Sequence, residues 1–255
     1  MTSHASTAQL DLSGRRVLIT GSSGGIGAAT AALAASRGAS VALHCRTRCD
    51  DARRHVEALR AAGATAVLLE GDLTDRRFRS SMIAAAIDAL GGLDGLVNNA
   101  GGADSCAILD LTEEALAAAF ALNFYAPVLL ARDALKHMRE HGGGRIVNVS
   151  SIGVKYGGSG TSLHYSAAKA ALELATVGLA KTGAPHQVLV NTVRPGVIRT
   201  AAFARTSSED FARRVGLIPV KRPGEPQEIA EMIAFLLSPA AAFITGQTLT
   251  VSGGD

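Results

Sequence analysis

Short apolar segments and longer segments with a helical period follow one another along the whole chain. The short segments are rich in β-branched residues and lack strict alternation of apolar and polar positions, which is typical of strands buried on both faces. They predict strands at 16–20, 40–45, 66–70, 95–99, 145–150, 188–193 and 248–253. Alanine-rich segments predict helices near 25–37, 51–62, 75–90, 113–140, 164–182 and 226–237.

The order of these elements predicts the fold class. Strands and helices alternate from one end to the other, which favours right-handed crossovers and a parallel sheet. We expect an α/β protein: a single-domain Rossmann fold over residues 1–255, with a doubly wound seven-stranded parallel sheet and helices on both faces. Residues 1–11 are expected to form a flexible lead-in, and the irregular segment 199–224 a lid over the substrate.

Composition and charge narrow the functional class. Lys and Arg number 25 and Asp and Glu 22, and a net charge of +3 gives no basic field for nucleic acid. No apolar run reaches about 18 residues, so no membrane span is expected. Cys45, Cys49 and Cys106 form no C-x-x-C pair and follow no signal peptide, so reduced thiols in a cytoplasmic protein are predicted. The histidines show no metal-ligand spacing, and no metal is expected.

A glycine-rich turn, TGSSGGIG, joins the first predicted strand to the first predicted helix. Gly21, Gly25 and Gly27 let a ligand approach the backbone, and the free N–H groups of a helix N-terminus attract a pyrophosphate, so the turn is predicted to bind a dinucleotide. The same residues fit G-x-S-x-G, the nucleophile elbow of α/β-hydrolases, with Ser23 as nucleophile. Only a short segment precedes this strand, and the HGGG at 141–144 follows the serine instead of preceding it, which disfavours a hydrolase.

The end of the second predicted strand indicates which dinucleotide binds. An NAD-preferring site places an acidic residue there to hold the ribose 2′-hydroxyl. This chain has Cys45 at that position, followed by Arg46 and then Arg48. A guanidinium can hydrogen-bond the 2′-phosphate that a carboxylate would repel. We therefore predict NADP(H) as the cofactor and Arg46 as its ligand, with a solvent-directed Arg46 as the alternative.

The segment YSAAK places Tyr165 and Lys169 four residues apart, on one face of a predicted helix. A positive charge about 5 Å from the phenol would favour the tyrosinate by about 3 kcal/mol at an effective dielectric constant of about 20. We therefore predict that Lys169 lowers the pKa of Tyr165 toward neutrality, which suits a general acid and base.

Seven motifs then occur in one order along the chain. They are TGSSGGIG (20–27), GDLTD (71–75), NNAG (98–101), SS (150–151), YSAAK (165–169), RPGVIRT (194–200) and TGQTLTVSGG (245–254). With these motifs the chain resembles the short-chain dehydrogenase/reductase family over nearly its whole length, and within it the NADP-dependent 3-oxoacyl-[acyl-carrier-protein] reductases. The resemblance implies the catalytic residues Asn123, Ser151, Tyr165 and Lys169. It implies cofactor contacts from Gly21, Ser23, Gly25, Ile26, Gly27, Arg46, Asp72, Leu73, Asn99, Ala100, Gly101, Tyr165, Lys169, Pro195, Gly196, Val197 and Thr200.

The resemblance also implies roles for these residues. Asp72 would contact the adenine, and Val197 and Thr200 the nicotinamide carboxamide. Lys169 would hold the nicotinamide ribose. Asn123 would anchor a water that links the lysine to solvent, although a helix asparagine can instead bond only to neighbouring backbone.

One spacing departs from the family pattern. Ser151 precedes Tyr165 by 14 residues, whereas the corresponding spacing in many relatives is 13. The glycine-rich segment between them can absorb one residue. If it does not, Ser150 or Ser159 would take the place of Ser151 as the hydroxyl that donates to the substrate oxygen.

The sequence therefore predicts an oxidoreductase that transfers a hydride between NADP(H) and a small carbonyl or secondary-alcohol substrate, with a 3-oxoacyl thioester as one candidate. Because the family is usually tetrameric, a homotetramer is expected. Two other functions stay open: a catalytically silent dinucleotide-binding regulatory protein, which would not need an acid–base pair, and an α/β-hydrolase that uses Ser23.

Overall fold

A seven-stranded sheet lies at the centre of the protein in the computed structural model, which describes residues 10–201 and 208–255. The strands are β1 (Arg16–Ile19), β2 (Ser40–Cys45), β3 (Ala66–Glu70), β4 (Gly95–Asn98), β5 (Gly144–Val149), β6 (Val188–Pro195) and β7 (Thr248–Val251). Their spatial order is β3-β2-β1-β4-β5-β6-β7, and every neighbouring pair is parallel. The predicted fold class is confirmed.

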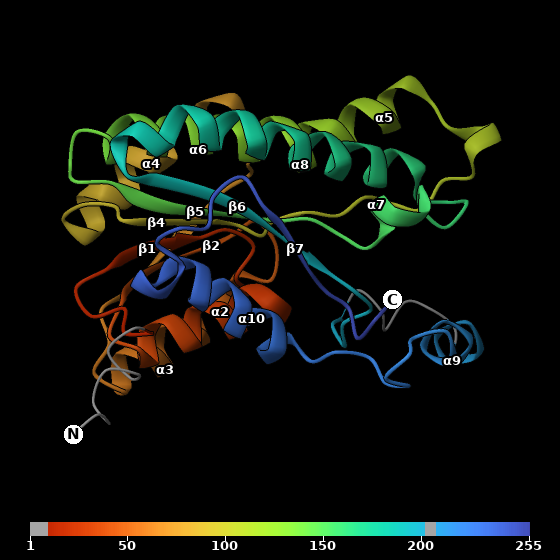
Figure 1. Cartoon of the computed structure of the whole chain (residues 1–255), viewed down its shortest axis with the longest axis horizontal. Helices are drawn as coiled ribbons and strands as arrows, with labels where there is room; N and C mark the ends of the chain where they lie inside the picture. Colours follow the sequence, from red (N-terminus) through yellow and green to blue (C-terminus); the bar gives the residue numbers. More distant parts are fainter. Residues whose placement is uncertain (1–9, 202–207) are drawn as a thin grey trace.

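Helices cover both faces of this sheet (Figure 1). One face carries α4 (Arg76–Leu90), α6 (Ala126–Met138) and α8 (Leu163–Gly183), and the other carries α2 (Gly25–Ser36), α3 (Cys49–Ala61) and α10 (Pro226–Leu237). The shorter helices are α5 (Glu113–Phe120), α7 (Gly153–Tyr156), α9 (Ser208–Gly216), a π-helical turn η2 (Ala121–Tyr125) and the 3₁₀ turns η1 (Ile108–Asp110), η3 (Ala184–His186) and η5 (Pro239–Ala241).

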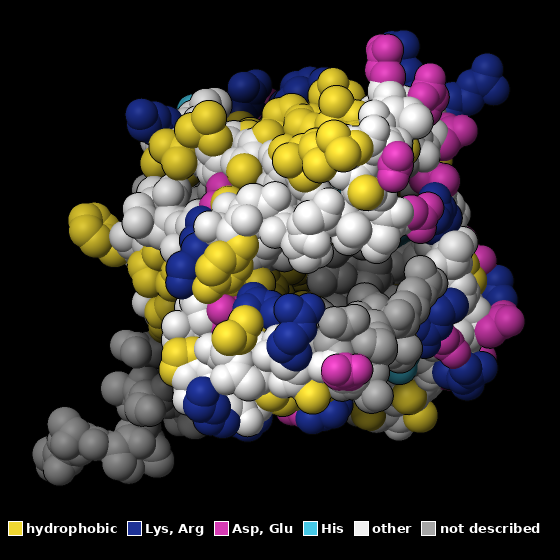
Figure 2. Space-filling view, turned by 90° about the vertical axis from the view of Figure 1, so that its right-hand side faces the viewer, with side chains coloured by type: hydrophobic (Ala, Val, Ile, Leu, Met, Phe, Trp, Pro, Cys, Tyr) yellow, Lys and Arg dark blue, Asp and Glu magenta, His cyan; other side chains and the backbone are white. Residues whose placement is uncertain are grey.

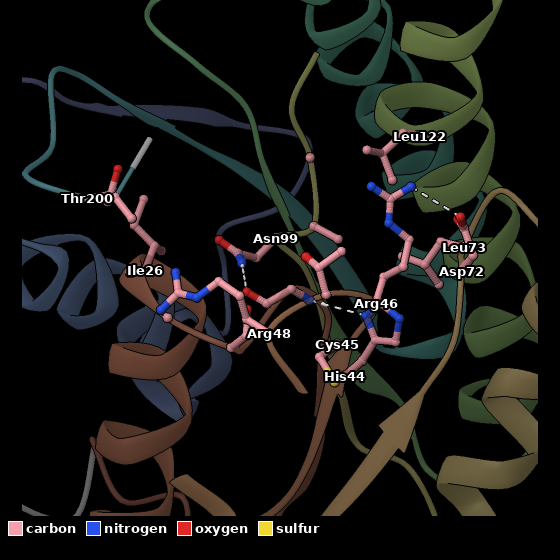
Figure 3. Close-up of a pocket in the computed structure, with 18 residues that line it drawn as sticks. Ile26, His44, Cys45, Arg46, Arg48, Asp72, Leu73, Asn99, Leu122 and Thr200 are labelled. Atoms are coloured by element: carbon pink, nitrogen blue, oxygen red, sulfur yellow. Dashed lines mark hydrogen bonds and ion pairs between the residues drawn. The ribbon is translucent and has the colours of Figure 1, made fainter. Parts of the chain in front are cut away.

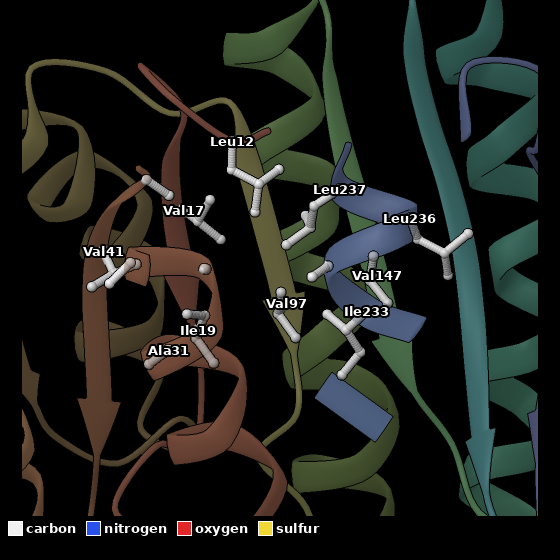
Figure 4. Close-up of a cluster of buried hydrophobic side chains, with 14 of the residues drawn as sticks. Leu12, Val17, Ile19, Ala31, Val41, Val97, Val147, Ile233, Leu236 and Leu237 are labelled. Carbon is white, nitrogen blue, oxygen red and sulfur yellow. The ribbon is translucent and has the colours of Figure 1, made fainter. Parts of the chain in front are cut away.

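Alternate strand residues supply two separate hydrophobic clusters, one under each helical layer. Val17 and Ile19 of β1 point into the cluster beneath α2 and α10, which Figure 4 shows with Ala31 and Ile233. Leu18, between them, belongs to the cluster beneath α4, α6 and α8. All three β1 side chains are fully or almost fully buried. Both faces of the strand are therefore apolar, which explains the lack of alternation in the sequence.

Local signals fix where several helices begin and end. The Asp75 carboxylate accepts hydrogen bonds from the N–H groups of Arg77 and Phe78 at the start of α4. α4 ends at Gly91, which adopts the left-handed conformation with φ 74°. A capping box between Glu225 and Glu228 starts α10. These caps satisfy backbone groups that the helix ends would otherwise leave unpaired.

The segment 199–224 was predicted to be irregular, but it contains the helix α9. This helix has only nine residues, too few for the sequence pattern to identify it. A tertiary contact holds it: Arg214 Nη2 lies 2.6 Å from the Asp255 carboxylate. Residues 202–207 of the expected lid and residues 1–9 of the expected lead-in lie outside the described residues.

The prediction of three reduced cysteines is wrong for two of them. Cys45 and Cys49 form a disulfide with their Cα atoms 5.7 Å apart, and Cys106 is free. Cys45 ends β2 and Cys49 begins α3, so the strand-to-helix turn brings together two residues that no C-x-x-C spacing connects. The prediction of a reducing, cytoplasmic location loses the support it drew from unpaired cysteines.

The continuous helical stretch Glu113–Met138 is apolar and long enough, by length and composition alone, to cross a membrane. Only 33% of its most apolar window is buried, but Leu130, Ala131 and Ala134 of α6 are fully buried against the sheet. Helices that belong to the core of a folded domain pass the same test. The expectation that no segment spans a membrane therefore depends on this packing, and it stays a prediction.

Candidate active site

A cavity of about 360 Å³ lies at the carboxyl ends of β1, β2 and β4, where the strand order reverses (Figure 3). Ligands of doubly wound sheets bind at such a point. Many of the predicted cofactor contacts line it: Gly21, Ser23, Gly25, Ile26, Arg46, Asp72, Leu73, Asn99, Ala100, Gly101 and Thr200. These predicted contacts come from five separate segments of the chain, which therefore meet around one cavity.

Other predicted cofactor residues do not line this cavity. Tyr165 and Lys169 lie beyond one end of it, and Pro195, Gly196 and Val197 are also absent from its wall. Val197 instead lines a smaller cavity beside α10. Gly27 is buried for a packing reason: a Cβ atom there would lie 2.3 Å from the Gly21 carbonyl oxygen, so this glycine lets α2 pack on the turn.

The N-terminus of α2 faces this cavity with open hydrogen-bond donors. Its N-cap residue, Gly24, has no side chain to accept from the first-turn N–H groups, and the first turn contains no acidic residue. Those N–H groups and the positive end of the helix dipole suit a phosphate. Gly21 has φ 67°, and a Cβ atom on it would lie 2.7 Å from the Ala100 Cα, so only glycine fits. The cradle therefore fits the pyrophosphate of a dinucleotide.

His44 fixes the turn from beneath, a role that the sequence analysis did not identify. Gly21 donates its N–H to His44 Nδ1 (3.3 Å), and His44 Nε2 lies 3.0 Å from the Gly71 carbonyl oxygen. These bonds require a neutral ring with its proton on Nε2. Burial lowers the pKa of His44, which favours the neutral form. The only sequence signal was a polar residue in an apolar strand.

Two arginines lie at the mouth of this cavity and point apart (Figure 3). Arg46 Nη1 lies 3.1 Å from the Asp72 carboxylate and is not simply solvent-directed, although its side chain is 55% exposed. Burial raises the pKa of Asp72, but hydrogen bonds from Thr74 and Arg46 outweigh burial and hold that pKa below its usual range. The Arg48 guanidinium lies over the glycine-rich turn, 3.5 Å from where a Gly24 Cβ would be. Arg48 is therefore a second cation at the cavity, which the predicted cofactor contacts did not include.

The NNAG segment links this turn to the central strands. Asn98 is buried and donates to the side-chain oxygen of Asn148 on the neighbouring strand β5 (2.9 Å). Asn99 donates to the carbonyl oxygens of Thr20 and Gly21, each at 2.9 Å. The Asn98 bond joins β4 to β5, and the Asn99 bonds hold the end of β4 against the turn after β1 where the cavity opens.

Gly101 is the point of contact between the cavity and the predicted catalytic residues. A Cβ atom on Gly101 would lie 2.8 Å from Asn123 Oδ1 and 2.9 Å from Lys169 Nζ. Lys169 is 2% exposed, and its ammonium donates to the Val149 carbonyl oxygen at 2.7 Å. Burial lowers the pKa of Lys169 to about 8. The lysine therefore lies directly behind the cavity wall, and its pKa is close to neutral pH.

Ser151 and Tyr165 face each other at this end. Burial raises the pKa of the Tyr165 phenol, and a hydrogen bond between this phenol and the Ser151 hydroxyl acts to lower it. Gly153 N–H donates to Ser151 Oγ (3.1 Å), which leaves the hydroxyl hydrogen free to point at the phenol. Lys169 Nζ lies 5.8 Å from the centre of the Tyr165 ring.

The structure brings Ser151, and neither of the two other serines, to the tyrosine. Ser150 instead donates to the Glu173 carboxylate (2.6 Å). Ser159 is exposed and pairs with Ser162. Between Ser151 and Tyr165 the chain forms the short helix α7, Gly153–Tyr156, which ends at Gly157 in the left-handed conformation.

The predicted direction of the Tyr165 pKa is wrong for this structure. Burial raises the pKa of Tyr165, and the Ser151 hydrogen bond offsets this only in part. The prediction counted the attraction of Lys169 but not the loss of water around the phenol, which disfavours tyrosinate. Burial acts on both members of the pair, so Tyr165 stays protonated while Lys169 becomes easier to deprotonate.

Asn123 lies in η2, a π-helical turn of the kind often found at functional sites. Its side-chain nitrogen donates to the carbonyl oxygens of Ala119 and Gly102, each at 2.8 Å, and its Oδ1 accepts from Gly102 N–H (3.0 Å). The bond to Ala119 is the neighbouring-backbone contact of the alternative, whereas the two bonds with Gly102 tie this helix to the loop beside Lys169. The water-anchoring role of Asn123 stays a prediction.

Comparison with known proteins places this geometry in a family. The sequence model of the family described as Enoyl-(Acyl carrier protein) reductase matches residues 21–255. The 3-oxoacyl-[acyl-carrier-protein] reductase FabG of Vibrio cholerae is 36% identical over 96% of this chain and 98% of that protein.

Solved structures of dehydrogenases also match this chain over nearly its whole length. A 7α-hydroxysteroid dehydrogenase complexed with NADH and 7-oxo glycochenodeoxycholic acid superposes with a TM-score of 0.92 at 31% identity, over 100% of this chain and 98% of that chain. An NAD(P)-dependent gluconate 5-dehydrogenase from Beutenbergia cavernae, so described and with bound NADP, gives 0.91 at 31% identity, over 96% and 98%. The chain therefore belongs to the short-chain dehydrogenase/reductase family and is an oxidoreductase.

Proposed function

We propose that this protein is an NADP(H)-dependent reductase of carbonyl compounds, and dehydrogenase of secondary alcohols, that uses Tyr165 as its general acid and base. The observation that carries the proposal is the arrangement of the half-buried Tyr165, hydrogen-bonded to Ser151 and close to the buried ammonium of Lys169, at the end of a glycine-lined cavity. A bound nicotinamide dinucleotide would supply or accept the hydride.

The protein's own groups would position both reactants. The open N–H groups of α2 would bind the pyrophosphate, and Arg46 and Arg48 would bind the ribose 2′-phosphate. At the other end, the Ser151 hydroxyl would donate to the substrate oxygen as negative charge develops there. Asn123 would hold the Gly102 backbone and so keep the loop closed against Lys169.

The protonation states in the structure suit carbonyl reduction. The phenol of Tyr165 is neutral and can give its proton to the developing alkoxide. Lys169, with its pKa lowered to about 8, can then pass a proton to the resulting tyrosinate. In the oxidation direction the same phenol must first lose its proton, and the positive charge of Lys169 favours that loss.

The choice of NADP(H) rests on the two arginines. No carboxylate ends β2, where an NAD-preferring site holds the ribose hydroxyl, and Arg46 and Arg48 are the charged groups between β2 and α3 at the cavity. The solved relatives include one with NADH and one with NADP, so family membership alone does not choose between them. A 3-oxoacyl thioester is the substrate proposed first, because it is the substrate named for the Vibrio relative.

The first test removes the proposed acid. The Tyr165→Phe variant should lose at least about 100-fold in kcat for NADPH-dependent ketone reduction, because positioned general acids contribute about 10²–10⁴-fold. The Kd for NADPH, measured by calorimetry, should change less than about threefold. Tyr125→Phe, at a 53% exposed tyrosine, is the matched control and should retain activity. Full turnover by Tyr165→Phe would show that another group supplies the proton.

The second test concerns cofactor choice. Arg46→Asp should raise the Kd for NADPH at least about tenfold, a loss of about 1.4 kcal/mol, and change the Kd for NADH much less. The new carboxylate would repel the 2′-phosphate and also the neighbouring Asp72. Arg132→Asp, on α6 away from the cavity, controls for the charge change. An unchanged NADPH-to-NADH ratio would remove Arg46 from the cofactor site.

The two other functions have less support. A catalytically silent binding protein would need neither the buried lysine nor the serine facing the phenol. A hydrolase would need a base beside Ser23, but the nearby histidine, His44, has both ring nitrogens bonded to backbone groups. A homotetramer and a cytoplasmic location belong to the proposal as further predictions.

A further inference from the structure

The Cys45–Cys49 disulfide encloses the loop that carries both arginines of the proposed 2′-phosphate site. Cys45 is the last residue of β2 and Cys49 the first of α3. Arg46, Thr47 and Arg48 lie between them, and Cys45 and all three enclosed residues line the cavity. A covalent bond between two neighbouring elements thus closes a five-residue ring around the cofactor-facing loop.

The conformation of this loop is one that a free chain seldom adopts. Arg48 has φ 56° and ψ 38°, in the left-handed region that disfavours residues other than glycine. In this conformation its guanidinium lies over the glycine-rich turn and its Nη2 contacts the Asp51 carboxylate (2.6 Å). The crosslink removes alternative loop conformations and so holds the guanidinium where a phosphate would meet it.

We propose that Cys45 and Cys49 form a reversible thiol–disulfide site whose oxidation state sets the affinity of this cavity for a 2′-phosphorylated dinucleotide. The effect on affinity rests on the cofactor assigned in the proposed function. The existence of the redox site does not, because it rests on the two cysteines alone. The oxidant is a low-molecular-weight disulfide of the glutathione class.

The exchange proceeds through Cys49, because Cys45 is 1% exposed whereas Cys49 is only partly buried. Cys49 also lies at the N-terminus of a 13-residue helix, where backbone N–H groups stabilise a thiolate. The Cys49 thiolate attacks one sulfur of the small disulfide and expels its other half as a thiolate. Cys45, after losing its proton, attacks the Cys49 sulfur and expels the second half. Two protein thiols are oxidised, and one small disulfide is reduced to two thiols.

A carboxylate beside the sulfurs favours the oxidised form. Oxygen of Glu70 and both sulfurs lie within 4.8 Å of one another. A thiolate there would face a like charge, whereas the disulfide is neutral. After reduction, the two thiols and the Glu70 carboxylate would be placed like the ligands of a cation. Arg53, however, already forms an ion pair with Glu70, with its Nη2 2.8 Å from Oε2. We therefore assign these groups to disulfide exchange and not to a metal.

Reduction should weaken NADPH binding more than NADH binding. The opened loop has more conformations to lose when it closes on a phosphate, whereas the ribose 2′-hydroxyl of NADH makes no ion pair with these arginines. We expect reduction to raise the Kd for NADPH about three- to tenfold and to change the Kd for NADH less than about twofold.

The test equilibrates the full chain in glutathione buffers of increasing reduced-to-oxidised ratio. Differential alkylation and peptide mass spectrometry measure the bond, and calorimetry measures the Kd values for NADPH and NADH. As the share of reduced glutathione increases, the peptides that contain Cys45 and Cys49 should change from disulfide to dithiol. The Kd for NADPH should rise over the same range of glutathione ratios. Cys49→Ser should show the weaker affinity in every buffer, whereas Cys106→Ser should keep the redox dependence.

Three results would overturn the proposal. The first is a pair of cysteines that stays reduced in oxidised glutathione, and the second is a disulfide whose reduction leaves the ratio of the two Kd values unchanged. The third is retention of one equivalent of Zn²⁺ by the reduced protein with protection of both thiols from oxidation. If NADPH does not bind in either state, the proposed cofactor and its redox control both fail, while alkylation still decides whether the bond forms.

Discussion

At the scale of single residues, the site depends on polar groups that the fold buries. Lys169 is enclosed and keeps one strong acceptor, the Val149 carbonyl oxygen, at 2.7 Å. Burial disfavours the charged forms of both side chains. It therefore lowers the pKa of Lys169, which becomes a weaker base, and raises the pKa of Tyr165, which becomes a weaker acid. These opposite effects move the two pKa values apart, so the tyrosinate left by proton donation is a stronger base than neutral lysine and Lys169 can return a proton to it.

His44 gives a pH prediction at the same scale. Its pKa is lowered from 6.5 by burial, so below about pH 6.5 the unfolded chain binds a proton that the folded protein resists. The unfolded state then holds more protons, and the stability of the fold decreases as the pH falls through that range. One proton limits this effect to about 1.4 kcal/mol per pH unit.

The measurement is the free energy of unfolding by urea between pH 5 and pH 8. The His44→Asn variant keeps an acceptor for Gly21 N–H but cannot titrate, so its stability should depend less on pH than that of the unmodified protein. His186→Asn, at an exposed histidine, is the control. Equal pH slopes for the unmodified protein and His44→Asn would contradict the neutral, buried histidine.

At the scale of elements, one carboxylate holds two segments near the catalytic end. The Asp255 side chain is 3% exposed, its Oδ2 lies 2.6 Å from Arg214 of α9, and its Oδ1 accepts from Tyr156 of α7 (2.9 Å). The Arg214 guanidinium also lies over the Tyr156 ring, 5.2 Å from its centre. α7 begins two residues after Ser151, so this contact connects the expected lid to the segment that carries the serine.

Asp255→Asn should therefore loosen α9. Arg214 would lose its ion pair, and we expect amide hydrogen exchange in 208–216 to become at least several-fold faster, with a cost of about 1–2 kcal/mol. KM for the carbonyl substrate should rise while kcat changes less, because the residue positions a substrate wall and touches no reacting atom. Glu140→Gln, which removes an exposed ion pair with Arg139, is the control. Unchanged exchange and KM would show that α9 is held by other contacts.

At the scale of the whole molecule, the layer of α5 and α8 exposes apolar side chains. Leu174 is 75% exposed, Tyr125 53%, Leu116 38% and Val177 37%. Hydrophobic side chains gather along the top of the molecule in Figure 2, at the height of α5 and α8 in Figure 1. An apolar patch on a layer of long helices favours association with a second copy.

The predicted homotetramer can be tested by light scattering coupled to gel filtration. The unmodified protein should have about four times the chain mass of 26.1 kDa, and Leu174→Glu should shift it toward smaller species, because a charge at a buried interface is costly. Ala58→Glu, on an exposed face of α3, should not. A monomeric unmodified protein would refute the tetramer and leave these side chains without a partner.

The sequence alone determined the sheet, the helices around it and most of the residues that meet at the cavity. These follow from local causes. Buried parallel strands must be apolar on both faces, a turn that approaches a phosphate needs glycine, and Tyr165 and Lys169 share a helix face whatever else surrounds them.

Only the tertiary structure decided the features that depend on burial and on contacts between distant segments. It reversed the predicted direction for the Tyr165 pKa, because solvent exclusion is a property of the packed site. It chose Ser151 over Ser150 and Ser159, paired Cys45 with Cys49, and placed Arg48 over the glycine-rich turn. No local pattern encodes these outcomes, since each depends on where a second segment of the chain comes to lie.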